Sequence, residues 1–105
     1  MARYILLAMN GPTNGEGDES LYIDWYNEVH IPAIKNIDGI IDANRFKVIR
    51  GKVPGELWPY LTIYEIETDD MSRVSAELAK AMQMWTPALN SSKSAHLFAM
   101  LISES

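Results

Sequence analysis

The middle of the chain carries two β-type segments in a row, IIDANRFKVIR at residues 40–50 and LWPYLTIYEIE at residues 57–67. Both are rich in β-branched and aromatic side chains, and the turn pair Pro54-Gly55 separates them. Pro59 is compatible with this assignment because proline is tolerated near the beginning of a strand. We therefore expect two consecutive strands at the centre of the chain.

A helical pattern precedes this pair and another follows it. Residues 18–20 (DES) offer an N-cap and acids for a first turn, and apolar residues recur at helical spacing after them. Pro32 disfavours the α conformation of the residue before it, so this helix is predicted to end or kink beside His30, in its last turn. The second helix is predicted to open at residues 68–70 and to continue toward Pro87.

Short apolar segments near the two ends complete the pattern. Residues 3–9 (RYILLAM) and 96–102 (HLFAMLI) are predicted to be the first and last strands. The resulting order β-α-β-β-α-β is that of a ferredoxin-like α+β sandwich with a four-stranded antiparallel sheet. At 105 residues, the chain is expected to form a single domain over residues 1–105.

Both faces of the first and last strands are apolar. In the first strand Leu6 and Ala8 point one way while Ile5 and Leu7 point the other, and residues 96–102 alternate in the same manner. Two helices can cover only one face of a four-stranded sheet, which would leave the other as a contiguous apolar patch. A homodimer that packs sheet against sheet is therefore expected.

Composition and charge argue against several classes of function. Nine Lys and Arg against fourteen Asp and Glu give a net charge of −5, which argues against nucleic acid as a partner. The sequence contains no cysteine, so disulfides, thiolate nucleophiles, zinc fingers and iron–sulfur sites are excluded. No apolar run approaches the roughly 18 residues of a membrane span, and we expect a cytoplasmic protein without a membrane partner.

No cofactor is expected either. The two histidines and the scattered acids lack the spacing of a metal site. Gly15-Glu16-Gly17 follows irregular residues rather than a strand, and it lacks the further glycine that a phosphate cradle needs. The sequence also has no Gly-x-Ser-x-Gly element for acyl transfer by an activated serine.

One helical stripe carries residues suited to proton transfer. Tyr22, Tyr26 and His30 are spaced at i, i+4 and i+8, flanked by Trp25 and Val29. An imidazole can both donate and accept a proton near neutral pH, and the tyrosine hydroxyls could assist it. A helix C-terminus would favour the charged ring and burial the neutral one. The alternative is a histidine that satisfies helix-terminal carbonyls and caps a packed core.

The segment WYNEVHIP (residues 25–32), followed by Gly39 and Arg45-Phe46, resembles the W-Y-x-x-x-H-x-P, G, R-[YF] pattern of the dimeric α+β-barrel superfamily, with EthD-like proteins as the nearest members. Residues 60–65 (YLTIYE) are similar to the third-strand segment of the same group. The resemblance implies a ferredoxin-like subunit that dimerises through its sheets and holds a small-molecule pocket between sheet and helices. It places the family's histidine at His30.

The resemblance does not single out one reaction. Members described as enzymes include muconolactone-type isomerases, polyketide and olivetolic-type cyclases, cofactor-free quinone-forming monooxygenases and lyases. Other members have no assigned activity.

Four further residues are candidates for substrate binding. Arg45 could hold a carboxylate or phenolate with its planar guanidinium, or lie on a solvated face or in a dimer ion pair. Tyr64 could donate its phenol to a pocket, or be a half-buried residue whose hydroxyl reaches water. His96 could be a second proton-transfer group, or simply begin its strand. Trp85, with nearby methionines at positions 71, 82 and 84, could line a pocket for a flat aromatic molecule or belong to the core.

These residues lead to a first hypothesis and its rivals. The first is a cofactor-independent enzyme in which His30, assisted by Tyr26 or Tyr22, performs an elimination, isomerisation or cyclisation on an aromatic or polyketide-like small molecule. A cofactor-free monooxygenase is the near rival. A non-catalytic dimer that binds a hydrophobic metabolite, and a purely structural dimer, are the alternatives from other classes.

Overall fold

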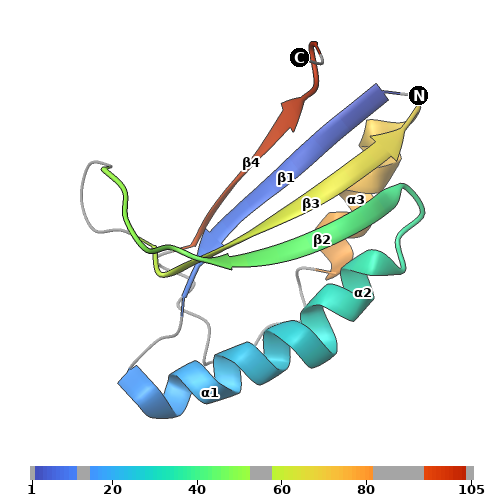
Figure 1. Cartoon of the computed structure of the whole chain (residues 1–105). Helices are drawn as coiled ribbons and strands as arrows, with labels where there is room; N and C mark the ends of the chain where they lie inside the picture. The colour runs from blue at the N-terminus through green and yellow to red at the C-terminus, as the bar shows by residue number, and fades with distance from the viewer. Residues whose placement is uncertain (1, 12–14, 53–57, 82–93, 104–105) are drawn as a thin grey trace.

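The structure is a computed structural model that describes residues 2–11, 15–52, 58–81 and 94–103. Its elements are β1 (Ala2–Asn10), α1 (Gly15–Trp25), η1 (Tyr26–His30), α2 (Ile31–Lys35), β2 (Ile40–Lys47), β3 (Tyr60–Thr68), α3 (Met71–Ala81) and β4 (Ala95–Met100). The four strands form one antiparallel sheet in the order β2-β3-β1-β4 (Figure 1). The predicted ferredoxin-like α+β fold is confirmed.

The core lies between one face of the sheet and the helices α2 and α3. Leu6 of β1 is directly opposite Tyr64 of β3, and both side chains are fully buried. Ile34 from α2 and Val74 and Leu78 from α3 join them in one apolar cluster. Burial of each large apolar side chain contributes about 1.5–3 kcal/mol to stability, so this cluster fixes both helices on the same face.

The helix that carries His30 continues beyond it. η1 is a π-helical turn in which the Ile31 backbone N–H donates to the Tyr26 carbonyl, and α2 follows with Pro32 in its first turn. A proline ring needs space in the preceding turn and supplies no N–H, and the wider π turn accommodates both requirements. Of the two outcomes predicted beside His30, the helix end is therefore wrong, because His30 lies within a continuous helical path.

Other element boundaries differ from prediction by a few residues. The first helix begins at Gly15 rather than at residues 18–20, and β2 ends at Lys47 rather than at residue 50. β3 begins immediately after Pro59, which has no N–H to donate but whose carbonyl accepts from the Val48 backbone N–H at 2.9 Å. The part of the second predicted helix that follows Ala81 lies outside the described residues, and so do Met82, Met84 and Trp85.

Gly39 joins α2 to β2 in a backbone conformation that favours glycine. Its φ angle is +108°, a value that side chains with a Cβ rarely adopt. A Cβ at this position would also lie 3.1 Å from Cγ2 of Val74, a core residue of α3. The glycine therefore allows the turn to pack closely on the second helix.

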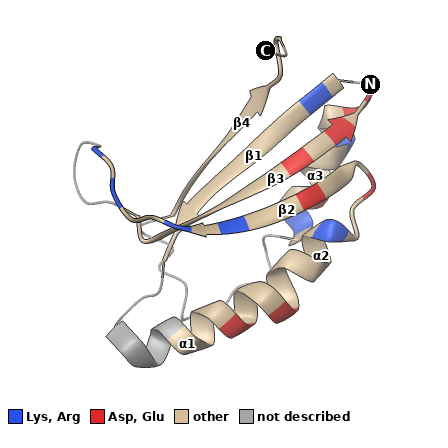
Figure 2. Ribbon diagram, in the orientation of Figure 1, with Lys and Arg blue, Asp and Glu red and all other residues tan. Residues whose placement is uncertain are grey.

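The other face of the sheet carries apolar side chains that the described helices leave uncovered. Ile5, Phe46 and Leu97 are 37%, 47% and 44% exposed, respectively. Leu7 is opposite both Leu97 and Ile63, so the apolar surface crosses from β4 over β1 to β3. β4 carries no Lys, Arg, Asp or Glu, and the charged residue of β1 is Arg3 (Figure 2). We call this surface the open face.

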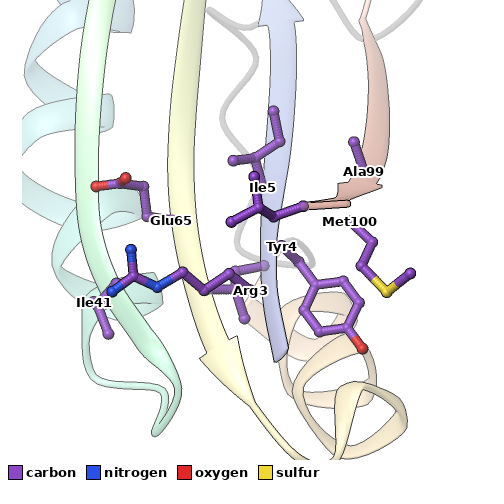
Figure 3. A pocket seen from close by; sticks show the side chains of 9 residues that line it. Arg3, Tyr4, Ile5, Ile41, Glu65, Ala99 and Met100 are labelled. Atoms are coloured by element: carbon purple, nitrogen blue, oxygen red, sulfur yellow. The ribbon is translucent and has the colours of Figure 1, made fainter. Parts of the chain in front are cut away.

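A cleft of about 400 Å³ indents the open face. Arg3, Ile5, Glu65 and Ala99 are among its lining residues (Figure 3). The Arg3 guanidinium is paired with the Glu67 carboxylate at 3.5 Å. Because this cleft opens on the uncovered side of the sheet, it is separate from the pocket that the family resemblance implies between sheet and helices.

None of the described helices is long and apolar enough to cross a membrane.

Candidate functional site

The predicted stripe of Tyr22, Tyr26 and His30 faces the sheet. These side chains are 0%, 1% and 6% exposed, respectively. The rings of Tyr22 and Tyr26 lie 5.4 Å apart, centroid to centroid, and Tyr26 meets His30 edge-on at 4.8 Å. Val29, expected to flank the stripe, is instead 42% exposed. The sequence spacing therefore located three residues that the structure brings together.

His30 is buried against Trp25 and Tyr26. Its ring stacks on Trp25 at 4.7 Å with an angle of 21° between the planes. No partner for Nδ1 exists among the residues that the structure describes. Burial, with a smaller contribution from the positive charge of Arg45, lowers the pKa of His30 from 6.5 to about 4. The ring is therefore neutral at neutral pH, and the predicted effect of a helix C-terminus does not arise.

Arg45 lies on the helix-covered face of the sheet, opposite Thr62 in the β2–β3 ladder. Its guanidinium carbon is 4.2 Å from the ring centroid of Tyr26 and 5.3 Å from those of Tyr22 and Tyr60. It donates to the Tyr22 hydroxyl at 3.1 Å, whereas Nε, which is buried, has no partner in the described part of the chain. A fully solvated position, one of the two alternatives for Arg45, is therefore wrong.

Among the side chains that the structure describes, which do not include those of residues 15–19, no carboxylate pairs with Arg45. Arg3 is paired with Glu67, and Arg73 is paired with Glu77 at 2.8 Å. By contrast, Arg45 contacts the faces of tyrosine rings, a phenol oxygen and, at 3.5 Å, the amide oxygen of Asn27. A partly buried cation surrounded by neutral groups is suited to bind an anionic oxygen.

Asn10 is a member of the site that sequence reasoning missed. It is the last residue of β1 and only 8% exposed. Tyr22 donates its hydroxyl hydrogen to Asn10 Oδ1, and Asn10 Nδ2 donates to the Tyr26 hydroxyl at 3.2 Å. The available signal was strand alternation, which places Asn10 on the same face as Leu6 and Ala8, but the predicted first strand ended at residue 9.

Two hydroxyls of β3 complete the polar lining. Tyr64 and Thr62 are buried on the same face, and neither hydroxyl has a hydrogen-bond partner among the described residues. Burial raises the pKa of Tyr64, and the neighbouring Tyr26 phenol adds to this rise, so Tyr64 stays protonated. The alternative of a half-buried Tyr64 whose hydroxyl reaches water is wrong. Burial likewise raises the pKa of Tyr22, although Arg45 opposes it.

The structure places two of the remaining candidates, His96 and Met71, outside this cluster. His96 lies on β4 opposite Ala8, is exposed, and contacts Phe98 edge-on at 6.1 Å. Met71 packs against the apolar core rather than into the tyrosine cluster. Trp85 lies outside the described residues. The described site therefore consists of His30, the two helical tyrosines, Arg45, Asn10 and the hydroxyls of Tyr64 and Thr62.

Comparison with known proteins supports the fold. No protein-family model and no curated protein matches the chain. A dimeric ferredoxin-like protein of unknown function from Jannaschia sp. CCS1 is similar, with a TM-score of 0.67 and 12% identity over 94% of this chain and 99% of that chain. An EthD-family protein from Bacillus halodurans C-125 has a TM-score of 0.60 and 11% identity over 94% and 97% of the two chains.

A third similar structure comes from Shewanella loihica PV-4 and carries a provisional assignment as a monooxygenase. Its TM-score is 0.63 at 11% identity, and 99% of each chain is covered. The resemblance to EthD-like and other dimeric ferredoxin-like proteins is thus confirmed at the level of the fold.

Proposed function

We propose that the chain is a cofactor-independent enzyme in which His30 moves a proton on an aromatic or polyketide-like small molecule. The observation that carries this proposal is the buried Nδ1 atom of His30, which has no partner in the described chain and belongs to a neutral ring packed on Tyr26. A buried polar atom without a partner costs about 1–3 kcal/mol, and a ligand that supplies one would recover it.

The first step would remove a proton from a carbon next to a carbonyl. Nδ1 of His30 takes the proton, and the electrons of the C–H bond form a carbon–carbon double bond while the carbonyl π electrons move to oxygen. The phenol hydroxyls of Tyr26 and Tyr64 and the positive charge of Arg45 would stabilise the resulting enolate. The enolate in turn attracts the imidazolium, which raises the pKa of His30 in this complex above its value in the free protein.

The second step would determine the class of reaction. Return of the proton to another carbon gives an isomerisation, loss of a group next to the carbanion gives an elimination, and attack of the carbanion on a second carbonyl gives a cyclisation. Each route uses the same base and the same stabilised oxygen, and a positioned general base contributes about 10²–10⁴-fold to the rate.

The open face supports a homodimer as the form in which the enzyme acts. Its apolar surface crosses at least three strands, and Leu97 and Phe46 are substantially exposed. A stable dimer buries about 800 Å² on each partner, which calls for a contiguous surface of this kind. The Jannaschia protein of the same fold is described as dimeric.

A cofactor-free monooxygenase is the second candidate, because the Shewanella protein of the same fold carries that assignment. In this reaction the deprotonated substrate itself would reduce dioxygen. Oxygen uptake that matches substrate consumption would indicate the monooxygenase, whereas turnover without oxygen would indicate proton transfer alone.

The proposal can be tested without knowing the natural substrate. The aromatic ketone 1-indanone has exchangeable hydrogens next to its carbonyl, and proton NMR in D₂O follows their loss. We expect the wild-type protein to accelerate exchange over buffer and His30→Gln to lose about 10²-fold or more of this acceleration. Lys35→Gln, which removes an exposed basic group from the neighbouring α2, serves as the matched control. A ketone that binds to the wild type without any acceleration would instead indicate a binding protein.

A further inference from the structure

The hydrogen bonds around Asn10 run in one direction. A guanidinium can only donate, so the Tyr22 oxygen accepts from Arg45. Tyr22 has one hydrogen, which it donates to Asn10 Oδ1. The amide therefore presents its NH₂ group to Tyr26, whose oxygen accepts at 3.2 Å. The positive charge of Arg45 thus sets the direction of a chain that ends at the phenol beside His30.

This direction leaves the hydrogen of the Tyr26 hydroxyl free to be donated elsewhere. Because its oxygen already accepts from Asn10, its hydrogen cannot also point along that bond. Tyr64 and Thr62 provide two further buried hydroxyls; neither meets the geometry of a hydrogen bond in the described chain, although the Tyr26 phenol lies near enough to Tyr64 to raise its pKa. Chains of hydrogen bonds polarise one another, so a donor at the end of a chain that starts at a cation is strengthened.

We propose that Asn10 is a positioning residue that holds the Tyr26 phenol as a hydrogen-bond donor to a carbonyl or enolate oxygen of the ligand. This inference rests on the proposed function and narrows its substrate class to molecules whose reacting oxygen accepts hydrogen bonds. Tyr26 is then the donor and His30 the base, so the two neighbouring side chains have opposite roles in one step.

A structural role alone would also explain a buried asparagine. Asn10 ends β1 beside Gly11, where any Cβ would collide with the ring of Pro59, and this contact limits the space at the strand end. The groups that face Asn10 are Tyr22 and Tyr26 from the helix and Tyr60, its partner on β3, with Arg45 reached through Tyr22. A test must therefore report the direction of the hydrogen bonds rather than stability.

The substitution Asn10→Asp provides such a test. An ionised aspartate accepts at both oxygens, so the Tyr26 hydrogen would turn toward it and away from the ligand. A protonated aspartate carries a hydrogen that it can donate to Tyr26, which restores the original direction. Acidification should therefore recover the function of this variant, and the carbonyl stretch of the bound ketone shows whether the recovered function includes the hydrogen bond from Tyr26.

The readouts are the affinity for 1-indanone and the infrared carbonyl stretch of the bound ketone. A neutral ketone is used because it is not repelled by the added charge. In Asn10→Asp at about pH 8 we expect binding about tenfold weaker and a higher stretching frequency, as after loss of one hydrogen bond, with both returning on acidification. Tyr26→Phe should show the same loss without recovery, and the exposed Asn36→Asp should behave as the wild type.

Two results would overturn the inference. If folded Asn10→Asp binds the ketone with wild-type affinity and stretching frequency at every pH, Asn10 does not direct the Tyr26 hydrogen, and the proposed function stands without it. If the wild-type protein does not bind the ketone at all, both the ligand role of Tyr26 and the proposed function fail.

Discussion

Arg45 and Tyr26 are in cation–π contact, with the guanidinium carbon 4.2 Å from the centroid of the ring. His30 packs edge-on against the same ring at 4.8 Å. One phenol thus links a permanent cation to a buried imidazole, and the cation contributes to the low pKa of that imidazole. The strand residue therefore adds to the effect of burial in keeping the helical base neutral.

Removal of Arg45 should raise the pKa of His30. We expect Arg45→Met to move the pKa upward from about 4 but to leave it below 6.5, because burial is the larger cause of the shift and persists in the variant. NMR titration of the His30 ring protons measures the change. Arg73→Met, which removes a cation paired with Glu77 on α3, should leave the value unchanged, and an unchanged value in both variants would refute the link.

The stability of the protein should depend on pH through His30. The folded pKa of about 4 lies below the unfolded value of 6.5, so the folded state binds fewer protons between them. The contribution of the His30 titration to the free energy of unfolding is fully present above about pH 6.5. It is lost as the pH falls toward 4, by up to about 3 kcal/mol. Urea unfolding should therefore show that His30→Gln loses less stability than the wild type over this range. Equal losses would contradict a buried, neutral His30.

Substitution of Gly39 should destabilise the fold without affecting the site directly. Its positive φ and the close approach of Val74 Cγ2 predict a loss of about 2 kcal/mol in Gly39→Ala. Gly51→Ala, at an exposed glycine without positive φ, should change the free energy of unfolding by less than about 0.5 kcal/mol. An unchanged free energy of unfolding in Gly39→Ala would contradict this prediction, because it would show that the turn can relax.

A charge on the open face should separate the proposed dimer. Leu97→Lys would place an ammonium group in an apolar interface, and we expect dimerisation at least about tenfold weaker, measured by sedimentation velocity. Leu21→Lys changes a leucine that is 60% exposed on α1 and should leave the dimer intact. A wild-type protein that sediments as a monomer would show that the open face is not a dimer interface.

The sequence was sufficient for the fold and for part of the site. Helical spacing brought Tyr22, Tyr26 and His30 together because residues four apart share a face even where the helix widens into a π turn. The sequence left open whether the helix ends or kinks at Pro32, since the rule for the residue before proline assumes an ordinary α turn. His30 was therefore expected in a last turn that does not exist.

Arg45 was a candidate from the sequence, but the face on which it lies could not be predicted, and Asn10 was missed altogether. The β2–β3 register shifts between Ile40 and Asp42, so the face on which Arg45 lies depends on an irregularity that alternation alone does not reveal. Asn10 precedes a glycine- and asparagine-rich stretch that predicts a loop. The ladder with β3 nevertheless includes Asn10, which is paired with Tyr60. Both roles follow from long-range pairing rather than from local pattern.

The pH dependence of the ketone exchange rate tests the central claim most directly. At low concentrations of 1-indanone, the rate reports the pKa of the base in the free protein. The account predicts that the exchange rate rises as the pH passes about 4 and stays level around neutrality. In His30→Gln this rise near pH 4 should be absent. An inflection near 6.5, or a step that persists in His30→Gln, would contradict it.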